Sequence, residues 1–249
     1  MSSLRLRDTW VVRRREALTL LGIYAAFTAI WFSVGWLLTH PLKHSAIVRT
    51  DESISRWFVA HRTPRWNSLS FAGSMLSDTV VKIVVTAVVA TVMLIVWKRW
   101  LEPLMVVVPL ILEALTFITV TTLVGRPRPD VQKLDTSPVG TSYPSGHTAA
   151  AVIYSAIVIV LFWHTRRRWI RAIGVFVAGV LPVLVALARL YRGMHFLTDV
   201  IFGALLGGAS VLASALVIRR SAEDLHLPLD GTNRDDHRLA EPSSELTPA

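Results

Sequence analysis

Histidine, aspartate, arginine and serine side chains occur together in three short motifs of this chain, each at the end of an apolar stretch. The first motif runs from Gly125 to Asp130, the second from Tyr143 to His147, and the third from Arg189 to Asp199. Arginines bind phosphate oxygens, histidines attack or transfer protons, and a carboxylate can orient a histidine. If the three motifs meet in the fold, they could therefore bind a phosphate ester and cleave it.

The third motif pairs a histidine with a carboxylate. His195 and Asp199 stand four residues apart at the start of an apolar stretch, so both project from one face of a helix. The carboxylate can accept a hydrogen bond from one imidazole nitrogen, which leaves the other nitrogen free to attack. Arg189 ends the preceding apolar stretch, and its planar guanidinium suits phosphate oxygens.

The second motif places Ser145, Gly146 and His147 at the start of another apolar stretch. The unpaired N–H groups and the positive dipole end of a helix attract an anion there. Gly146 lets the main chain approach a phosphate, and Ser145 can donate a hydrogen bond. His147, beside bound phosphate, could give a proton to a leaving oxygen as general acid.

In the first motif Arg126 and Arg128 alternate with Pro127 and Pro129. The prolines stiffen the loop, so the guanidinium groups lose little entropy on binding. Each motif alone has a structural interpretation: a histidine–aspartate pair at a helix start, an arginine-rich loop at a membrane edge, or a helix cap. The combination of all three favours a functional site.

The composition indicates an integral membrane protein. Of 249 residues, 53% are hydrophobic and 17% are charged, and the mean hydropathy is +0.50. The net charge of +9 comes from basic residues at the edges of apolar runs, which indicates anionic lipid head groups and not nucleic acid. The chain has 0 cysteines, which excludes disulfides, thiolate metal sites and cysteine nucleophiles.

Six apolar stretches are long enough to cross a bilayer, which takes roughly twenty residues. They cover approximately residues 17–38, 78–97, 102–123, 146–163, 172–188 and 196–218. Each should be a helix, because an open strand edge in lipid would leave backbone groups unpaired. The expected fold class is therefore all-α, an integral membrane six-helix bundle.

Lysines and arginines are concentrated before the first span, between spans two and three, between spans four and five, and after the sixth span. The positive-inside rule makes that side cytoplasmic. We therefore expect a multi-pass protein of the cell (plasma) membrane with both termini in the cytoplasm and the three motifs on the external face. Residues 1–16 would form a basic cytoplasmic N-terminus, 17–218 the membrane domain, and 219–249 a disordered cytoplasmic tail.

The first external loop predicts an amphipathic helix lying in the membrane interface. Its apolar side chains recur at helical spacing, with polar side chains on the other face: Ile54, Trp57, Phe58 and His61 against Glu52, Ser55 and Arg56. A surface helix packed on the bundle is the alternative.

The three motifs together resemble the signature of the type 2 phosphatidic acid phosphatase family, whose membrane branch has six helices. The matching residues are Arg128-Pro129, Pro144-Ser145-Gly146-His147, and Arg189, His195 and Asp199 with their spacing. The resemblance covers about residues 78–218. It implies a membrane lipid phosphatase.

The resemblance also implies roles for individual residues. His195 would be the nucleophile that forms a phosphohistidine, Asp199 would orient it, and His147 would protonate the leaving group and then activate water. The phosphate would be held by Arg128, Ser145, Gly146 and Arg189. No metal and no cofactor are expected, because guanidinium groups and the helix dipole would stabilise the charge.

Two positions depart from the family pattern. The family's first motif usually begins with a lysine seven residues before the arginine of Arg-Pro, where this chain has Thr121, and the serine usually preceding the third-motif arginine is Ala188. Thr121 removes a cation from the phosphate site. We expect Arg126 to replace it as a phosphate-binding residue, with Lys82 as a weaker alternative.

The expected substrate is a lipid phosphomonoester or diphosphate that enters from the outer leaflet. A polyprenyl diphosphate such as undecaprenyl diphosphate is favoured, since an external site suits a carrier lipid left there after its cargo is transferred. Phosphatidic acid and phosphatidylglycerol phosphate are the alternatives. The expected partners are lipid phosphates and membrane lipids, with no nucleic acid, and the oligomeric state stays open.

Other classes of function stay open on the sequence. A vanadate-dependent peroxidase would share the phosphate-binding residues, although six spans conflict with its soluble setting. A non-catalytic membrane protein that binds or transports phosphate lipids would be consistent with Thr121, Ala188 and Glu113. Glu113 lies within the third span, where a hydrogen bond to a neighbouring helix is the favoured explanation. A phosphotransferase would use the same chemistry with another acceptor.

Overall fold

A computed structural model of the protein describes residues 13–137 and 139–225. The helices in these residues are α1 (Arg14–Thr39), α2 (Ala46–Ala60), α3 (Pro64–Met75), α4 (Thr79–Trp97), α5 (Leu101–Val124), α6 (Gly146–Ile153), α7 (Ser155–His164), α8 (Arg168–Tyr191) and α9 (Leu197–Asp224). Several begin where a short polar side chain accepts a hydrogen bond from the first turn: Ser45, Thr63, Asp78 and Ser145. At the end of α5, Gly125 has a φ of 61°, which favours glycine and turns the chain into the first motif.

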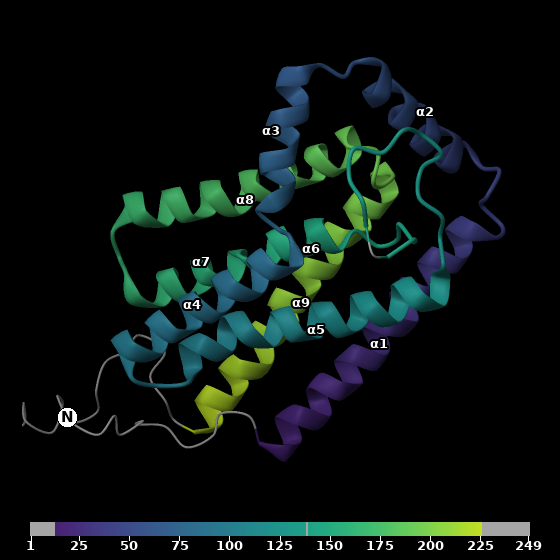
Figure 1. Ribbon diagram of the computed structural model, residues 1–249. Coiled ribbons are helices and arrows are strands. Elements are labelled where there is room, and N and C mark those ends of the chain that lie inside the picture. The colour runs from purple at the N-terminus through teal and green to yellow at the C-terminus, as the bar shows by residue number, and fades with distance from the viewer. Residues whose placement is uncertain (1–12, 138, 226–249) are drawn as a thin grey trace, which may run out of the picture.

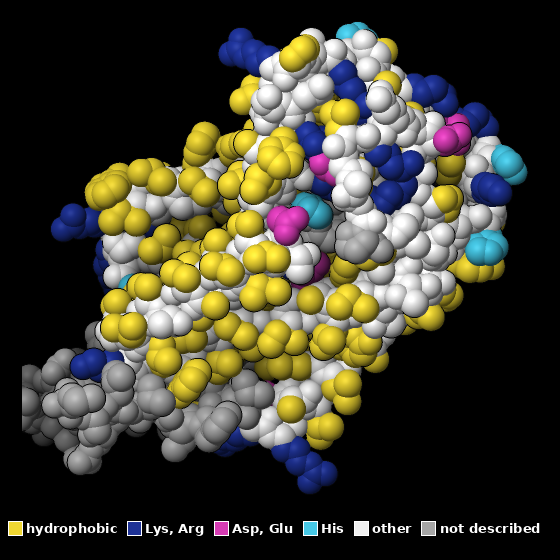
Figure 2. All heavy atoms as spheres, viewed as in Figure 1, with side chains coloured by type: hydrophobic (Ala, Val, Ile, Leu, Met, Phe, Trp, Pro, Cys, Tyr) yellow, Lys and Arg dark blue, Asp and Glu magenta, His cyan; other side chains and the backbone are white. Residues whose placement is uncertain are grey.

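Six helical stretches are long and apolar enough to cross a membrane: α1, α4, α5, α6 with α7, α8, and α9. The prediction of a six-helix membrane bundle is confirmed. The outward side chains are apolar as well; on α4, for example, Val80, Ile83 and Val88 are 68%, 55% and 56% exposed. Figure 2 shows hydrophobic side chains as a broad band over the transmembrane helices. The protein is therefore a multi-pass membrane protein.

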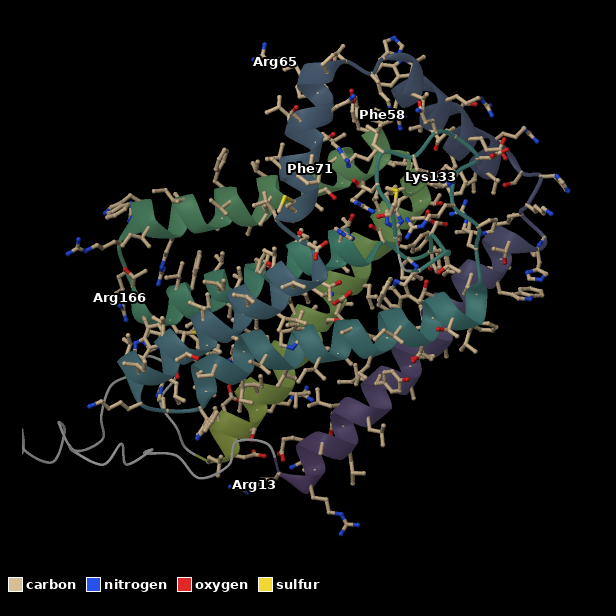
Figure 3. All side chains as sticks on the ribbon, in the orientation of Figure 1. Arg13, Phe58, Arg65, Phe71, Lys133 and Arg166 are labelled. Atoms are coloured by element: carbon tan, nitrogen blue, oxygen red, sulfur yellow. The ribbon has the colours of Figure 1, made fainter. Side chains whose placement is uncertain are left out.

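The two ends of the bundle differ in what they carry (Figure 1). At one end lie the start of α1, the α4–α5 and α7–α8 connections, and the end of α9. At the other end lie α2, α3 and the long loop of residues 125–145. Arg13 and Arg166 mark the first end, and Arg65 and Lys133 the second (Figure 3). The basic connections thus share one side, as predicted, and the three motifs share the other.

Helix α9 packs against α1, α5 and α6. A Cβ atom on Gly203 would lie 2.4 Å from the Ser145 carbonyl oxygen, and one on Gly207 would lie 2.5 Å from the Ala149 carbonyl oxygen. The backbones of α9 and α6 are therefore almost in contact. This close packing brings the third motif, at the start of α9, against the second motif, at the start of α6.

We expect Gly203→Ala to lower both stability and activity. The added methyl group cannot fit beside the Ser145 carbonyl, so α9 must shift away from α6, at a cost of about 1–3 kcal/mol. Gly179→Ala is the matched control, because no atom lies within 4 Å of its Cβ position in α8. The melting temperature of both variants in detergent checks this. Equal melting temperatures for Gly203→Ala and Gly179→Ala would contradict the packing account.

Three details of the fold differ from the sequence predictions. The fourth span is two helices, α6 and α7, which meet at Tyr154. Helix α3 was not predicted. The predicted amphipathic helix is present as α2, but Ser55, expected on its outer face, is buried together with Asp51, while Trp57 is 56% exposed. Glu52 and Arg56 are exposed as predicted, whereas the side of the helix with Asp51 and Ser55 turns inward, where Asp51 pairs with a buried arginine of the first motif.

Helix α9 continues to Asp224, so the first residues of the predicted tail, 219–224, are helical. Most of the predicted N-terminal segment and of the tail lies outside the described residues.

Candidate active site

A cavity of about 430 Å³ lies at the end of the bundle that carries α3 and the long loop. Its lining includes several of the predicted site residues: Arg128, Gly146, His147, Arg189 and His195. Side chains from α3, α4 and α5 complete the wall, among them Ser74, Lys82 and Phe117. In the space-filling view, a histidine and acidic side chains are visible at a hollow between the polar end of the molecule and the apolar band (Figure 2).

His195 is held by a backbone carbonyl. Its Nδ1 lies 2.7 Å from the Ser142 oxygen, and because a carbonyl can only accept, Nδ1 must carry the proton. The neutral ring therefore has its lone pair on Nε2. The residue is 4% exposed, yet it lines the cavity. This arrangement leaves Nε2 as the nitrogen that can attack a bound substrate.

The prediction that Asp199 accepts a hydrogen bond from His195 is wrong. Asp199 Oδ2 is 3.9 Å from His195 Nδ1, beyond hydrogen-bond distance. Both oxygens are engaged elsewhere: Oδ2 accepts from the Phe196 N–H at 2.8 Å, and Oδ1 accepts from Arg126 at 2.6 Å. Asp199 instead fixes the start of α9, next to His195, and its backbone oxygen accepts from the Ser145 N–H at 3.0 Å.

Arg126 does not line the cavity, so its predicted role in phosphate binding is not supported. Its guanidinium donates to Asp199 Oδ1 at 2.6 Å and to Asp51 Oδ2 at 2.9 Å. It also donates to the Thr198 hydroxyl at 2.7 Å and lies over the Phe196 ring. Arg126 is 4% exposed. Two carboxylates thus neutralise this arginine and hold it behind the wall of the cavity.

In the second motif, Gly146 and His147 line the cavity as predicted, but Ser145 does not. Ser145 was expected to donate to phosphate, but its hydroxyl caps α6 by accepting from the Thr148 N–H at 3.5 Å, and it contacts the Thr148 hydroxyl at 3.1 Å. Ser145 is fully buried and is not part of the cavity wall. Gly146 and His147 do line the cavity, so the N-terminal turn of α6 presents an imidazole and backbone N–H groups to it.

Two arginines of the site face the cavity, and each is fixed from behind. Arg128 donates to the Met194 carbonyl at 2.6 Å and to the Ser137 hydroxyl at 2.9 Å. Arg189 donates to the Ser74 hydroxyl at 2.6 Å and to Asp135 Oδ2 at 3.0 Å. Asp135 also lines the cavity. One carboxylate therefore lies beside the Arg189 guanidinium, which is a candidate for binding phosphate.

Asp135 is held in its charged form. Burial disfavours its carboxylate, but the hydrogen bond from Arg192 and the charges of Arg189 and Arg192 outweigh this, so the pKa of Asp135 lies below its ordinary value. The carboxylate therefore stays ionised at neutral pH.

The position of the usual family lysine is polar but uncharged. The Thr121 hydroxyl lies 2.6 Å from that of Thr141, which lines the cavity. Lys82, the alternative considered from the sequence, does line the cavity, and its ammonium nitrogen lies 3.3 Å from Glu113 Oε2. Glu113 thus bonds to a neighbouring helix, as predicted.

Burial lowers the pKa of His195 well below its ordinary value, and the positive charges of Arg189 and Arg128 lower it further. Because the neutral form of a histidine persists at every pH above its pKa, His195 is uncharged at neutral pH. A neutral imidazole is the form that can act as a nucleophile.

Residues 102–223 match the sequence model of the PAP2 superfamily. The match includes all three motifs, each of which contributes at least one side chain to the cavity. This chain belongs to the PAP2 superfamily. The predicted relationship to type 2 phosphatidic acid phosphatases is confirmed.

Among PAP2 relatives, the chain is 29% identical over 177 residues to phosphatidylglycerophosphatase B of Bacillus subtilis (strain 168), covering 69% of this chain and 84% of the relative. It is 40% identical over 74 residues to undecaprenyl-diphosphatase of Sulfolobus acidocaldarius, a match that spans 30% of this chain and only 32% of that protein. The crystal structure of the transmembrane PAP2-type phosphatidylglycerolphosphate phosphatase of Bacillus subtilis superposes with a TM-score of 0.62 at 25% identity, covering 80% of this chain and 96% of that one.

Sequence reasoning missed several residues of this PAP2 site. Asp51 lies 75 residues from Arg126, with which it pairs, and only its position four before Ser55 on one helix face could have drawn attention to it. Asp135 lies in an irregular loop without periodicity. The Ser142 contact uses a backbone carbonyl, which leaves no trace in the residue type.

Proposed function

We propose that this protein hydrolyses a lipid phosphomonoester or diphosphate through a phosphohistidine on His195. The observation that carries the proposal is the fixed tautomer of His195, whose Nδ1 donates to the Ser142 carbonyl at 2.7 Å. The unprotonated Nε2 is thereby available in a cavity that also holds Arg128, Arg189 and His147.

In the first step, Arg128, Arg189 and the backbone N–H groups at the start of α6 would bind the phosphate. Nε2 of His195 attacks the phosphorus, and the bond from phosphorus to the leaving oxygen breaks. His147, protonated in the complex, gives its proton to that oxygen. The product is the dephosphorylated lipid, with the phosphate on His195.

In the second step, His147 accepts a proton from water, and the water oxygen attacks the phosphohistidine. The bond between phosphorus and Nε2 breaks, and inorganic phosphate leaves. The two arginines stabilise the charge on the phosphoryl oxygens in both steps. The cations of the site would thereby supply what a metal ion supplies in other phosphatases, so we propose a metal-independent hydrolase.

Among lipid phosphates we favour a polyprenyl diphosphate such as undecaprenyl diphosphate, on the ground of an external active site. Similarity to an undecaprenyl-diphosphatase supports this choice. Phosphatidylglycerol phosphate is the second candidate, because phosphatidylglycerophosphatase B matches over a larger part of the chain. Phosphatidic acid is the third.

Phosphate release by the purified protein in detergent with EDTA tests this proposal. The substrates are polyprenyl diphosphate, phosphatidylglycerol phosphate and phosphatidic acid, with a lipid alcohol as acceptor in a parallel reaction. We expect EDTA-resistant release, fastest from the diphosphate. Similar rates on all three lipids would remove the substrate preference, transfer to the alcohol would indicate a phosphotransferase, and no release would favour a non-catalytic phosphate-binding protein.

The external position of the site is part of the proposal and is tested separately. The chain has 0 cysteines, so single cysteines can be introduced at Val139, in the loop beside the cavity, and at Arg167, in the α7–α8 connection. We expect a membrane-impermeant thiol reagent to label the first and not the second in intact cells. The reverse pattern would place the site in the cytoplasm and contradict carrier-lipid recycling.

The pH dependence of kcat/KM should respond to the charge of Arg128. Removing that charge in Arg128→Gln eliminates one cause of the lowered His195 pKa, so His195 becomes protonated at a higher pH and the acid limb moves upward. Wild type and variant are compared on the same substrate, so its own ionisation contributes equally to both profiles. An acid limb that stays in place would show that His195 is not the titrating nucleophile.

A further inference from the structure

Lys82 is a buried cation on a transmembrane helix that the proposed reaction does not yet use. It lies in the first turn of α4 and is 8% exposed, and its ammonium group faces the cavity and Glu113. Ionisable groups at membrane depth are costly, and where they occur they usually line a substrate path or pair with one another. Lys82 does both.

Glu113 does not fully satisfy Lys82. One carboxylate oxygen, Oε2, accepts from Lys82 Nζ at 3.3 Å, a long contact for a charged pair. The other oxygen, Oε1, is buried without a hydrogen-bond partner. An ammonium group has three donors, so Lys82 keeps donors that can reach an anion in the cavity.

The position of Lys82 within the cavity follows from its neighbours. Glu113 and Phe117 lie one turn apart on the same face of α5. A Cβ atom on Gly146 would lie 3.0 Å from the Phe117 ring, so this face of α5 abuts the start of α6. Lys82, held by Glu113, is thereby placed on the side of the cavity that carries His147.

The charges around the two histidines agree with this placement. Among charged side chains, Arg189 and then Lys82 act most strongly on the His147 ring, whereas Arg189 and Arg128 act most strongly on His195. Lys82 therefore lies nearer to His147, which protonates the leaving oxygen, than to His195.

We propose that Lys82 binds the phosphate that leaves with the lipid when the substrate is a diphosphate. This inference rests on the proposed function, in which His195 takes the terminal phosphoryl group and His147 protonates the bridging oxygen. With a diphosphate the leaving group is a lipid monophosphate, which carries negative charge beside His147. With a phosphomonoester the leaving group is an uncharged alcohol, and Lys82 has no second phosphate to bind. Lys82 thus selects diphosphates.

The test compares polyprenyl diphosphate with polyprenyl monophosphate, which share one tail. In Lys82→Met we expect kcat/KM for the diphosphate to fall about 10- to 100-fold, the effect of a lost charge-assisted hydrogen bond. For the monophosphate we expect less than about a threefold change in kcat/KM, because the leaving alcohol carries no charge for Lys82 to bind. Lys82→Arg should retain much of the preference. Lys43→Met, an exposed lysine in the α1–α2 connection, is the control.

A structural role for the ion pair has to be separated from ligand binding. In Lys82→Met alone, Glu113 loses its partner, which could impair folding. The double variant Lys82→Met with Glu113→Gln removes both charges, and we expect it to fold while still lacking the preference for diphosphate. A double variant with full diphosphate activity, or equal losses on both substrates, would overturn the inference.

A binding measurement keeps the inference testable if the protein proves not to be a phosphatase. The probes are inorganic diphosphate and inorganic phosphate, and the readout is the rise in melting temperature of the purified protein. We expect a larger rise with diphosphate in wild type and a similar rise with both ions in Lys82→Met. A wild-type protein that does not prefer diphosphate would overturn the inference, whatever the outcome of the lipid assays.

Discussion

Replacing His195 with alanine lowers phosphate release from the lipid substrate by at least about 10³-fold, the scale seen when a covalent nucleophile is removed. His195 is the cavity histidine whose Nδ1 is held by a backbone carbonyl, so that its unprotonated Nε2 is available beside Arg128 and Arg189. The assay is release of inorganic phosphate by purified protein in detergent.

A second substitution separates this catalytic role from a structural one. The His195 ring donates to the Ser142 carbonyl, and His195→Asn keeps an amide donor that can serve that carbonyl. We expect His195→Asn to retain the melting temperature of wild type and to be as inactive as His195→Ala. Substantial activity in His195→Asn would exclude His195 as the nucleophile.

Replacing Arg126 with alanine destabilises the protein by about 3–5 kcal/mol, the cost of leaving a buried ion pair without one partner. Arg126 is the common partner of Asp51 and Asp199, which are 1% and 0% exposed. Without the guanidinium both carboxylates would stay buried, and the start of α9, which carries His195, would lose its anchor. The melting temperature in detergent and the yield of folded protein measure the effect.

Arg128→Ala is the comparison, because Arg128 faces the cavity while Arg126 does not. We expect Arg128→Ala to impair catalysis more than stability, and Arg126→Ala to impair stability first. Arg126→Lys keeps the charge but lacks the fork that reaches two carboxylates, so an intermediate stability is expected. If Arg126→Ala kept the wild-type melting temperature and raised KM alone, Arg126 would be a phosphate-binding residue, as its sequence position first indicated.

The membrane helices could be predicted from the sequence because their cause is local. A run of about twenty apolar residues is sufficient to define a span, and each predicted span lies within or close to an observed helix. Helix α3 was missed because it has no such local signal. Its segment mixes Trp66, Leu69 and Phe71 with several serines, so the apolar residues follow no helical period. Its polar side chains face other parts of the protein; Ser74, for example, accepts from Arg189.

The site was predictable in its residue types and less so in its contacts. Arg128, Gly146, His147, Arg189 and His195 do line one cavity. Asp199 and Ser145 belong to the same motifs, but their side chains cap helices instead. A short polar side chain at a helix start can either cap it or face a ligand, and the sequence is the same in both cases.

Arg126 shows where sequence reasoning fails most clearly. It lies two residues from Arg128, yet the two side chains point to different surroundings, since Arg126 meets Asp51 and Asp199. The pairing with Asp51 depends on how α2 folds back over the site, which no local pattern encodes. The cation that the cavity does hold outside the three motifs is Lys82, on a helix that sequence order places far from them.

Trapping of the phosphorylated protein tests the central claim most directly. His147 would act in both steps, but a lipid monophosphate is a good leaving group even without a proton, whereas water needs the base; His147→Asn should therefore slow hydrolysis of the intermediate more than its formation. This variant is mixed with polyprenyl diphosphate and EDTA, quenched in alkali, which preserves phosphohistidine, and digested for mass spectrometry. We predict a phosphate on the peptide that contains His195. The double variant His147→Asn with His195→Asn should carry no phosphate on that peptide. A phosphate on another residue would contradict the phosphohistidine mechanism. So would turnover by wild type if neither wild type nor His147→Asn gave any phosphorylated protein.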